Sequence, residues 1–152
     1  MKKFENIDQI LDFAILNEQI AYDFYTKLSE NSKHEYIKNI FIEFAGEEKK
    51  HKEILQAIKE GKNIEISGEK VKNLNIDEYL EISSKNIDKM SFEDALLLAM
   101  KREKSAYRLY MLLAEQTDSI KMRNIFEKLA NEEAKHKLRF ETEYDDYVYR
   151  EN

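Results

Sequence analysis

Two of the three histidines in the sequence follow a glutamate by three residues: Glu48 with His51, and Glu133 with His136. At this spacing on an α-helix, a carboxylate and an imidazole lie on the same face. Carboxylate oxygens and imidazole nitrogens are donors that iron, manganese and zinc all accept in proteins. The two motifs therefore predict metal coordination, provided that both lie on helices that face each other.

Two further glutamates, Glu18 and Glu103, stand in the apolar stripes of two other predicted helices. Burying a carboxylate costs several kcal/mol unless it is paired or bound to a metal. Four inward carboxylates would repel one another, and two divalent cations would neutralise them. The sequence thus predicts a site for two metal ions with six ligands: Glu18, Glu48, His51, Glu103, Glu133 and His136.

Other polar residues near these positions have less specific interpretations. Tyr25 and Tyr110 each lie seven residues after one of the two single glutamates, on the same helix face. They either fill the core with a satisfied hydroxyl or hydrogen-bond ligand carboxylates across the bundle. Glu47 and Glu132 are expected on the helix flanks, at the surface or supporting the ligands. His34, in a polar break, is expected to be exposed.

The elements that must position these residues are visible as a helical periodicity. Apolar residues recur at steps of three and four, which is typical of helices that bury one face. The segments with this pattern are 7–28, 37–58, 92–113 and 122–144. Ser91 followed by Asp94 predicts the start of the third helix. Short polar breaks at 31–34 and 116–119 predict two antiparallel helical hairpins.

The two hairpins are copies of one another. Residues 14–52 and 99–137 align without a gap at an offset of 85, with 16 identities in 39 positions. The identities include glutamate, tyrosine and histidine, which amphipathic character alone would not repeat. Segment 61–90, with a short helix expected at 76–82, is long enough to cross the bundle and join the hairpins. Because the halves are so alike, Glu48→Ala and Glu133→Ala are expected to damage activity to a similar degree.

Composition excludes several classes of protein. The 152 residues include no proline, no cysteine and only three glycines, which disfavours all-β folds and excludes disulfides, thiolate nucleophiles and iron–sulfur clusters. The net charge of −6 argues against a nucleic-acid partner. No apolar run approaches the ~20 residues of a membrane span, and acidic residues near the N-terminus argue against a signal peptide. We expect one cytoplasmic domain over residues 1–152.

The pattern resembles the ferritin-like superfamily, and within it the rubrerythrin-type di-iron domain, over nearly the whole chain. Di-iron and di-manganese bundles of this superfamily use one glutamate from each of two helices and Glu-x-x-His from each of the other two. The residues that carry the resemblance are Glu18 with Ala21 and Tyr25, Glu48-Lys49-Lys50-His51, Glu103 with Tyr110, and Glu133-Ala134-Lys135-His136. The resemblance implies an all-α, ferritin-like four-helix bundle made of the two duplicated hairpins and a long crossover.

The same resemblance implies a function. Two iron ions, or manganese or zinc in their place, would occupy the site, and the protein would reduce hydrogen peroxide or react with dioxygen. The alternatives are an iron-binding or ferroxidase protein in iron handling, and a bundle whose metal is purely structural. Because a single hairpin cannot bury its own apolar stripe, a homodimer is expected, with hairpins either paired within one chain or exchanged between chains.

Two departures from the rubrerythrin pattern matter. Rubrerythrins carry a rubredoxin-like domain whose iron is held by four cysteines, and this chain has no cysteine. Electrons would therefore come from a separate protein such as a rubredoxin. Rubrerythrins also have an extra glutamate one turn after the ligand of the third helix, where this chain has Ala106, matched by Ala21 in the other half. The six-ligand set is in this respect more similar to that of bacterioferritin.

Overall fold

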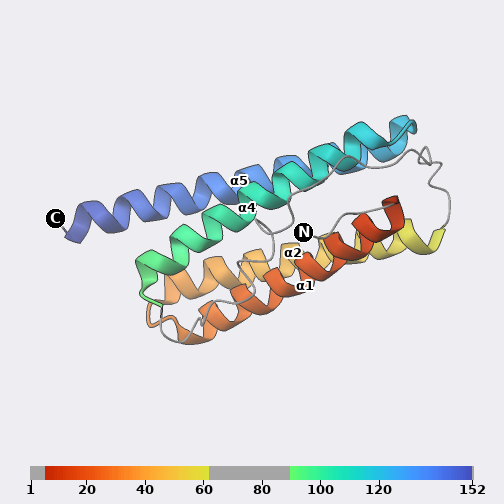
Figure 1. The fold of residues 1–152 in the computed structure, drawn as a ribbon. Helices are drawn as coiled ribbons and strands as arrows, with labels where there is room; N and C mark the ends of the chain where they lie inside the picture. Colours follow the sequence, from red (N-terminus) through yellow and green to blue (C-terminus); the bar gives the residue numbers. More distant parts are fainter. Residues whose placement is uncertain (1–5, 62–89, 152) are drawn as a thin grey trace.

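The computed structural model describes residues 6–61 and 90–151, and these residues form four long α-helices joined in pairs by short turns (Figure 1). The helices are α1 (Ile7–Asn31), α2 (Glu35–Gly61), α4 (Phe92–Gln116) and α5 (Ile120–Glu151). The predicted all-α bundle of two helical hairpins is confirmed. The expected crossover, with its short helix at 76–82, lies outside the described residues.

Side-chain caps mark where three of the helices begin. Asn6 Oδ1 accepts a hydrogen bond from the Gln9 backbone N–H at 3.0 Å at the start of α1. Ser91 Oγ accepts one from Asp94 N–H at 3.1 Å, which confirms the predicted start of α4. Ser119 Oγ accepts one from Met122 N–H at 3.2 Å, at the first turn of α5. Each cap satisfies a backbone donor that the helix itself leaves without a partner.

The direction of the helices explains why the ligands meet at one height. In Figure 1, α1 and α2 run antiparallel, as do α4 and α5, and the α1–α2 turn lies at the opposite end of the bundle from the α4–α5 turn. As a result, α2 ends at one end of the bundle and α4 begins at the other. The residues midway along each helix therefore lie side by side in the middle of the bundle.

The apolar core consists of two clusters, each built from all four helices. One cluster includes Ile10, Leu55, Leu109 and Phe126. The other includes Phe24, Phe41, Leu96 and Phe140. Along every helix, the predicted ligands lie between the residues of one apolar cluster and those of the other. A polar layer therefore separates the two apolar clusters, which shield it from water.

Most of the residues expected on the buried stripes are buried, with exceptions near one end of the bundle. Ile37, Phe92 and Tyr144 are only partly buried where they pack against the second cluster. The side chain of Ile7 lies outside the description. Among the described residues, no helix is both long enough and apolar enough to span a membrane.

Candidate metal centre

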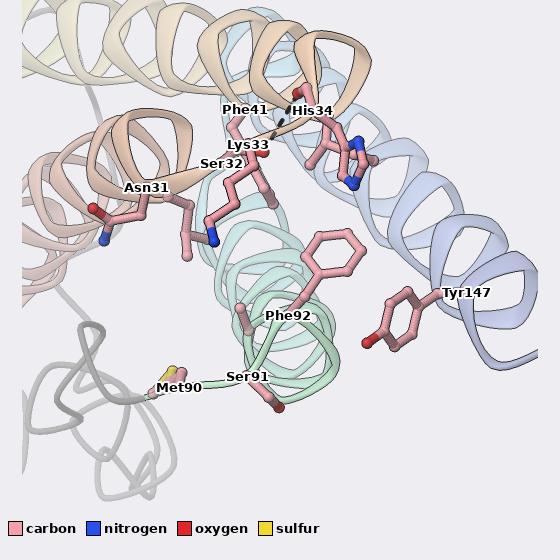
Figure 2. A pocket seen from close by; sticks show the side chains of 12 residues that line it. Asn31, Ser32, Lys33, His34, Phe41, Met90, Ser91, Phe92 and Tyr147 are labelled. Atoms are coloured by element: carbon pink, nitrogen blue, oxygen red, sulfur yellow. Dashed lines mark hydrogen bonds between the residues drawn. The ribbon is translucent and has the colours of Figure 1, made fainter. Parts of the chain in front are cut away.

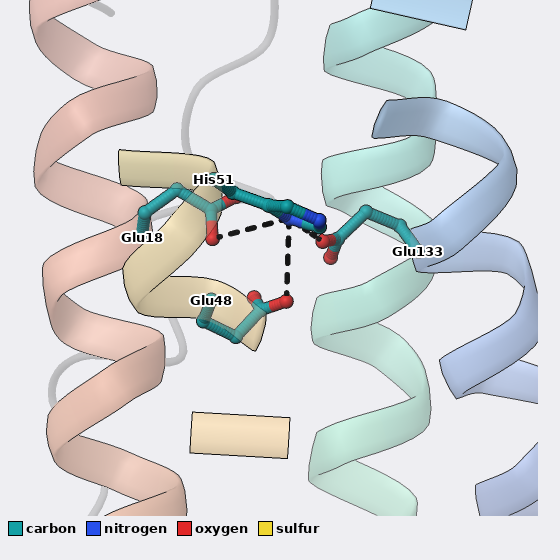
Figure 3. A group of neighbouring side chains, drawn as sticks. All are labelled: Glu18, Glu48, His51 and Glu133. Carbon is teal, nitrogen blue, oxygen red and sulfur yellow. Dashed lines mark ion pairs between the residues drawn. The ribbon is translucent and has the colours of Figure 1, made fainter. Parts of the chain in front are cut away.

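All six predicted ligands meet in the polar layer, and none of them is more than 4% exposed. α1 contributes Glu18, α4 contributes Glu103, and α2 and α5 each contribute a Glu-x-x-His pair. The donor atoms form two groups, and within each group they lie within 4.8 Å of one another. The groups are Glu18, Glu48, His51 and Glu133, shown in Figure 3, and Glu48, Glu103, Glu133 and His136.

Glu48 and Glu133 belong to both groups, whereas the other four residues belong to one group each. If each group held one metal ion, these two carboxylates would be shared between the two ions. Each ion would then have its own terminal glutamate and its own histidine. The arrangement follows the sequence repeat, because an offset of 85 converts each member of one group into a member of the other.

The distances between donor atoms are suited to a common ion. His51 Nδ1 lies 2.7 Å from Glu133 Oε1, 3.5 Å from Glu48 Oε1 and 3.7 Å from Glu18 Oε2 (Figure 3). His136 Nδ1 lies 3.4 Å from Glu48 Oε1 and 3.6 Å from Glu103 Oε1. Two donors that each bind one ion at ~2.1 Å lie about 3.0–3.4 Å apart, so all five distances are within about 0.3 Å of that range.

Hydrogen bonding supports the same conclusion. In the part of the chain that the structure describes, the buried side-chain nitrogen and oxygen atoms without a hydrogen-bond partner all belong to the six predicted ligands. They are Glu18 Oε2, both oxygens of Glu48, His51 Nδ1, Glu103 Oε2, both oxygens of Glu133, and His136 Nδ1. Leaving a buried polar atom without a partner costs about 1–3 kcal/mol, and more for a charged group. Two cations bound by these atoms would remove that cost, so the residues fit a pair of metal ions.

The outer side of each histidine is held by a glutamate of the opposite hairpin. His51 Nε2 contacts Glu132 Oε2 at 2.5 Å, and His136 Nε2 contacts Glu47 Oε2. Because a carboxylate can only accept, the Nε2 atoms carry the protons, and each Nδ1 is left facing the centre. The structure therefore decides between the two interpretations of Glu47 and Glu132: they support the ligands.

The two tyrosines make the hydrogen bonds that their spacing allowed. Tyr25 donates its hydroxyl proton to Glu103 Oε1, and Tyr110 donates to Glu18 Oε1. Burial, together with the nearby carboxylates, raises the pKa of both phenols, so both remain protonated donors. Each bond occupies one oxygen of a terminal glutamate, and the Oε2 atom of the same carboxylate is buried without a hydrogen-bond partner.

Arg102 is a buried residue of this layer that the sequence interpretation did not include. It is 4% exposed, donates from Nη2 to the backbone oxygen of Asn17 at 2.5 Å, and lies 3.7 Å from Glu48 Oε2. Burial acts to lower its pKa, but the surrounding Tyr25 and carboxylates outweigh burial and raise it, so the guanidinium stays charged. The only signal in the sequence is that Arg102 aligns with Asn17 in the repeat, directly before the matched glutamates.

The ligand side chains do not titrate alike in the metal-free site. Burial, reinforced by neighbouring carboxylates, raises the pKa of Glu18 and of Glu133 well above the usual range. Burial also acts to raise the pKa of Glu48, but contacts with His136 and Arg102 outweigh it, and the net shift is downward. Burial acts to lower the pKa of His136, yet its bonds to carboxylates raise it to about 12. Metal binding must therefore displace protons from the site.

Two surface pockets differ in their relation to the centre. The larger, about 870 Å³, lies by the α1–α2 turn, and its lining includes Lys33, His34, Phe92 and Tyr147 (Figure 2). None of the six predicted ligands lines it, and His34 is exposed as expected. A smaller pocket of about 400 Å³ is lined by residues of α2 and α5 and reaches His51. Of these two pockets, the smaller is the one whose lining includes a predicted ligand.

Comparisons with solved structures agree with the four-helix fold. A solved structure from Thermotoga maritima, named as a ferritin-like diiron-carboxylate protein, is 21% identical with a TM-score of 0.79, and the match covers 97% of this chain and 99% of that one. A hypothetical protein from Pyrococcus furiosus is 25% identical with a TM-score of 0.72, over 90% of this chain and 86% of that one. None of the curated proteins compared with this chain matches it.

The model of one protein family spans most of the sequence. The rubrerythrin model matches residues 9–144, which include both hairpins and all six predicted ligands. The paired Glu-x-x-His motifs and the four-helix bundle around them are consistent with that match. The chain therefore belongs to the rubrerythrin family.

Proposed function

We propose that this protein holds two iron ions and reduces hydrogen peroxide with electrons from a separate redox protein. Glu48 and Glu133 would bridge the ions, with Glu18 and His51 on one ion and Glu103 and His136 on the other. The observation that carries the proposal is that the buried atoms without hydrogen-bond partners, among the described residues, are all donors of this set. Carboxylate and imidazole donors in this combination suit iron, although manganese or zinc would fit the same set.

The reaction needs two electrons and two protons per peroxide and gives two waters. When bound, two iron ions would supply the two electrons, one from each ion, that reduction of the O–O bond without release of a radical requires. The protein's own residues orient the ligands: Tyr25 and Tyr110 fix the terminal glutamates, while Glu132 and Glu47 fix the histidines. The apolar clusters on both sides keep bulk water out, and the pocket beside His51 admits a small substrate.

Iron stoichiometry and peroxide turnover test this proposal together. Anaerobic titration of the metal-free protein with Fe(II) should saturate at two ions per chain, and one equivalent of peroxide should then oxidise both. With reduced rubredoxin supplied, peroxide should be consumed catalytically. His136→Ala should abolish turnover, whereas His34→Ala, at the exposed third histidine, should leave it unchanged. Saturation well below two ions in folded protein would contradict the proposal.

A ferroxidase in iron handling is the second candidate, and the residue at position 106 favours it. Ala106 is 4% exposed and packs in the first apolar cluster, one helical turn after Glu103. It occupies the place of the extra carboxylate described above for the rubrerythrin pattern. A ferroxidase would oxidise Fe(II) with dioxygen or peroxide and would not need rubredoxin for turnover.

Substitution at position 106 separates the two candidates. If peroxide turnover depends on the extra carboxylate, the wild type should be a slow peroxidase, and Ala106→Glu should speed it about tenfold, which corresponds to ~1.4 kcal/mol of activation free energy. Ala106→Gln has a side chain of similar size without the charge and should bring no such gain. Both variants must first be shown to bind two iron ions. A fast wild type that gains nothing from Ala106→Glu would refute this explanation and leave the metal site intact.

A further inference from the structure

The two halves of the chain differ in charge at a buried position beside the centre. The repeat aligns Glu18 with Glu103 and Glu48 with Glu133, but it aligns Asn17 with Arg102. The centre therefore contains one buried guanidinium without a counterpart in the other half. The expectation that the halves are equivalent does not take this charge into account.

The guanidinium of Arg102 lies next to one bridging carboxylate. Arg102 extends from α4 towards α1, where it donates a hydrogen bond to the backbone oxygen of Asn17. Its Nη2 lies 3.7 Å from Glu48 Oε2, which has no hydrogen-bond partner. In the internal repeat, Glu133 corresponds to Glu48 and Asn17 corresponds to Arg102, so the side chain at the matching position of the other half is neutral.

We propose that Arg102 is a positioning residue whose fixed charge holds Glu48 and makes it the weaker of the two bridging ligands. This inference rests on the two-metal site of the proposed function. Glu133 would then supply the larger share of the metal affinity, and Glu48 would be the carboxylate that changes its coordination more readily.

The physical reason is that the charge is permanent and lies in a dry part of the protein. An arginine side chain is not deprotonated in proteins, so its effect persists at every working pH. Interactions between charges are several times stronger in a protein interior than in water. A carboxylate oxygen that faces a guanidinium gains less by binding a metal ion than one without such a partner. Since Glu48 belongs to both donor groups, the effect applies to both ions.

Metal affinity in paired variants tests the inference without any measurement of turnover. Co(II) binding to the metal-free protein would be measured by visible absorption in competition with a chelator. Glu133→Gln should weaken binding at least about ten times more than Glu48→Gln, a difference of ~1.4 kcal/mol. In an Arg102→Met background, the two substitutions should differ by less than about threefold. In an Arg102→Lys background, which keeps the positive charge, Glu133→Gln should still weaken Co(II) binding more than Glu48→Gln does. If Arg102 had a purely structural role, the difference between the two substitutions would not depend on the charge at position 102.

The possible outcomes are distinct. If the wild-type chain binds Co(II) but Glu48→Gln and Glu133→Gln weaken it equally, this inference is overturned and the proposed site stands. A wild-type chain that binds no Co(II) at all overturns both. Arg139→Met, at an exposed arginine on α5, controls for the loss of a positive charge elsewhere. If Arg102→Met does not fold, the wild-type comparison and Arg102→Lys decide the result on their own.

Discussion

Each of the two divalent metal ions is expected to raise the melting temperature of the protein by about 10 °C at a concentration a thousandfold above its dissociation constant. A ligand that binds only the folded state contributes ~4 kcal/mol at that ratio, and each kcal/mol shifts the melting temperature by about 2–4 °C for a chain of this size. In the metal-free protein, four buried carboxylates share one layer, in which Arg102 and His136, both with raised pKa values, supply positive charge. Zinc avoids redox chemistry and is a suitable ion for this measurement.

The stabilisation by metal should increase with pH. Glu18 and Glu133 have raised pKa values, so their contribution to the stability of the metal-free protein is lost as the pH rises above the ordinary value of 4.5. His136, whose pKa is raised from 6.5 to about 12, contributes stability that declines over that interval. The lowered pKa of Glu48 changes stability only below pH 4.5.

Thermal melts with zinc and with a chelator, recorded at about pH 6, 7 and 8, measure this effect. The melting temperature of the metal-free protein should fall as the pH rises. The difference in melting temperature between the zinc-loaded and the metal-free protein should therefore widen. His34→Ala should behave as the wild type does. Coincident melting curves at neutral pH would show that the buried carboxylates carry no such energetic cost.

A second large effect is expected when the terminal glutamates are replaced together with the tyrosines that bind them. The fourfold variant carries two leucines and two phenylalanines: Glu18→Leu with Tyr110→Phe, and Glu103→Leu with Tyr25→Phe. It should not bind metal, and its metal-free bundle should be more stable than that of the wild type. Replacing buried ionic groups with apolar residues of similar size stabilises proteins by ~1–4 kcal/mol. The free energy of unfolding in urea, measured without metal, should rise by an amount in this range.

The tyrosine substitutions are needed because of the hydrogen bonds in the structure. Leucine alone would leave the hydroxyls of Tyr25 and Tyr110 buried without an acceptor, at a cost of about 1–3 kcal/mol each. The variant with only the two leucines should therefore gain less stability than the fourfold variant. A fourfold variant that is less stable than the metal-free wild type would contradict the view that these glutamates are retained for binding metal.

Much of the fold could be predicted because the pattern is strong and repeated. Four long periodic segments without proline permit little except helices, and the two Glu-x-x-His motifs fix which faces meet. The structure brings the six side chains together as the spacing predicts, and their binding of metal stays a prediction. The position of Tyr25 and Tyr110 on the ligand face was sufficient to suggest their bonds, but periodicity does not distinguish a packed tyrosine from a bonded one.

Other features could not be predicted because they depend on neighbours distant in the sequence. An arginine in a helix that is rich in charged residues is typical of a solvated surface, and only the packing of α4 against α1 shows that Arg102 is buried. The roles of Glu47 and Glu132 depend in the same way on the opposite hairpin. The helix expected to end at 144 continues to Glu151, because no glycine or proline interrupts the acidic and aromatic C-terminal residues.

Four of the bonds that join the two hairpins occur as two reciprocal pairs. When 85 is added to the number of the residue in the first hairpin and subtracted from the number of its partner in the second, each of these bonds becomes another of the four. The pairs are Tyr25–Glu103 with Tyr110–Glu18, and His51–Glu132 with His136–Glu47. Such reciprocity is the mark of an isologous interface, in which the same patch serves on both partners.

Two separate copies of one hairpin could therefore make all of these bonds and complete a centre of the same kind around a true two-fold axis. A symmetric pair, however, must have the same residue at both positions that correspond to Asn17 and Arg102, and so it carries either two buried guanidinium groups or none. Joining the hairpins in one polypeptide removes that restriction. The covalent link thus permits a single unmatched charge beside a symmetric set of six ligands.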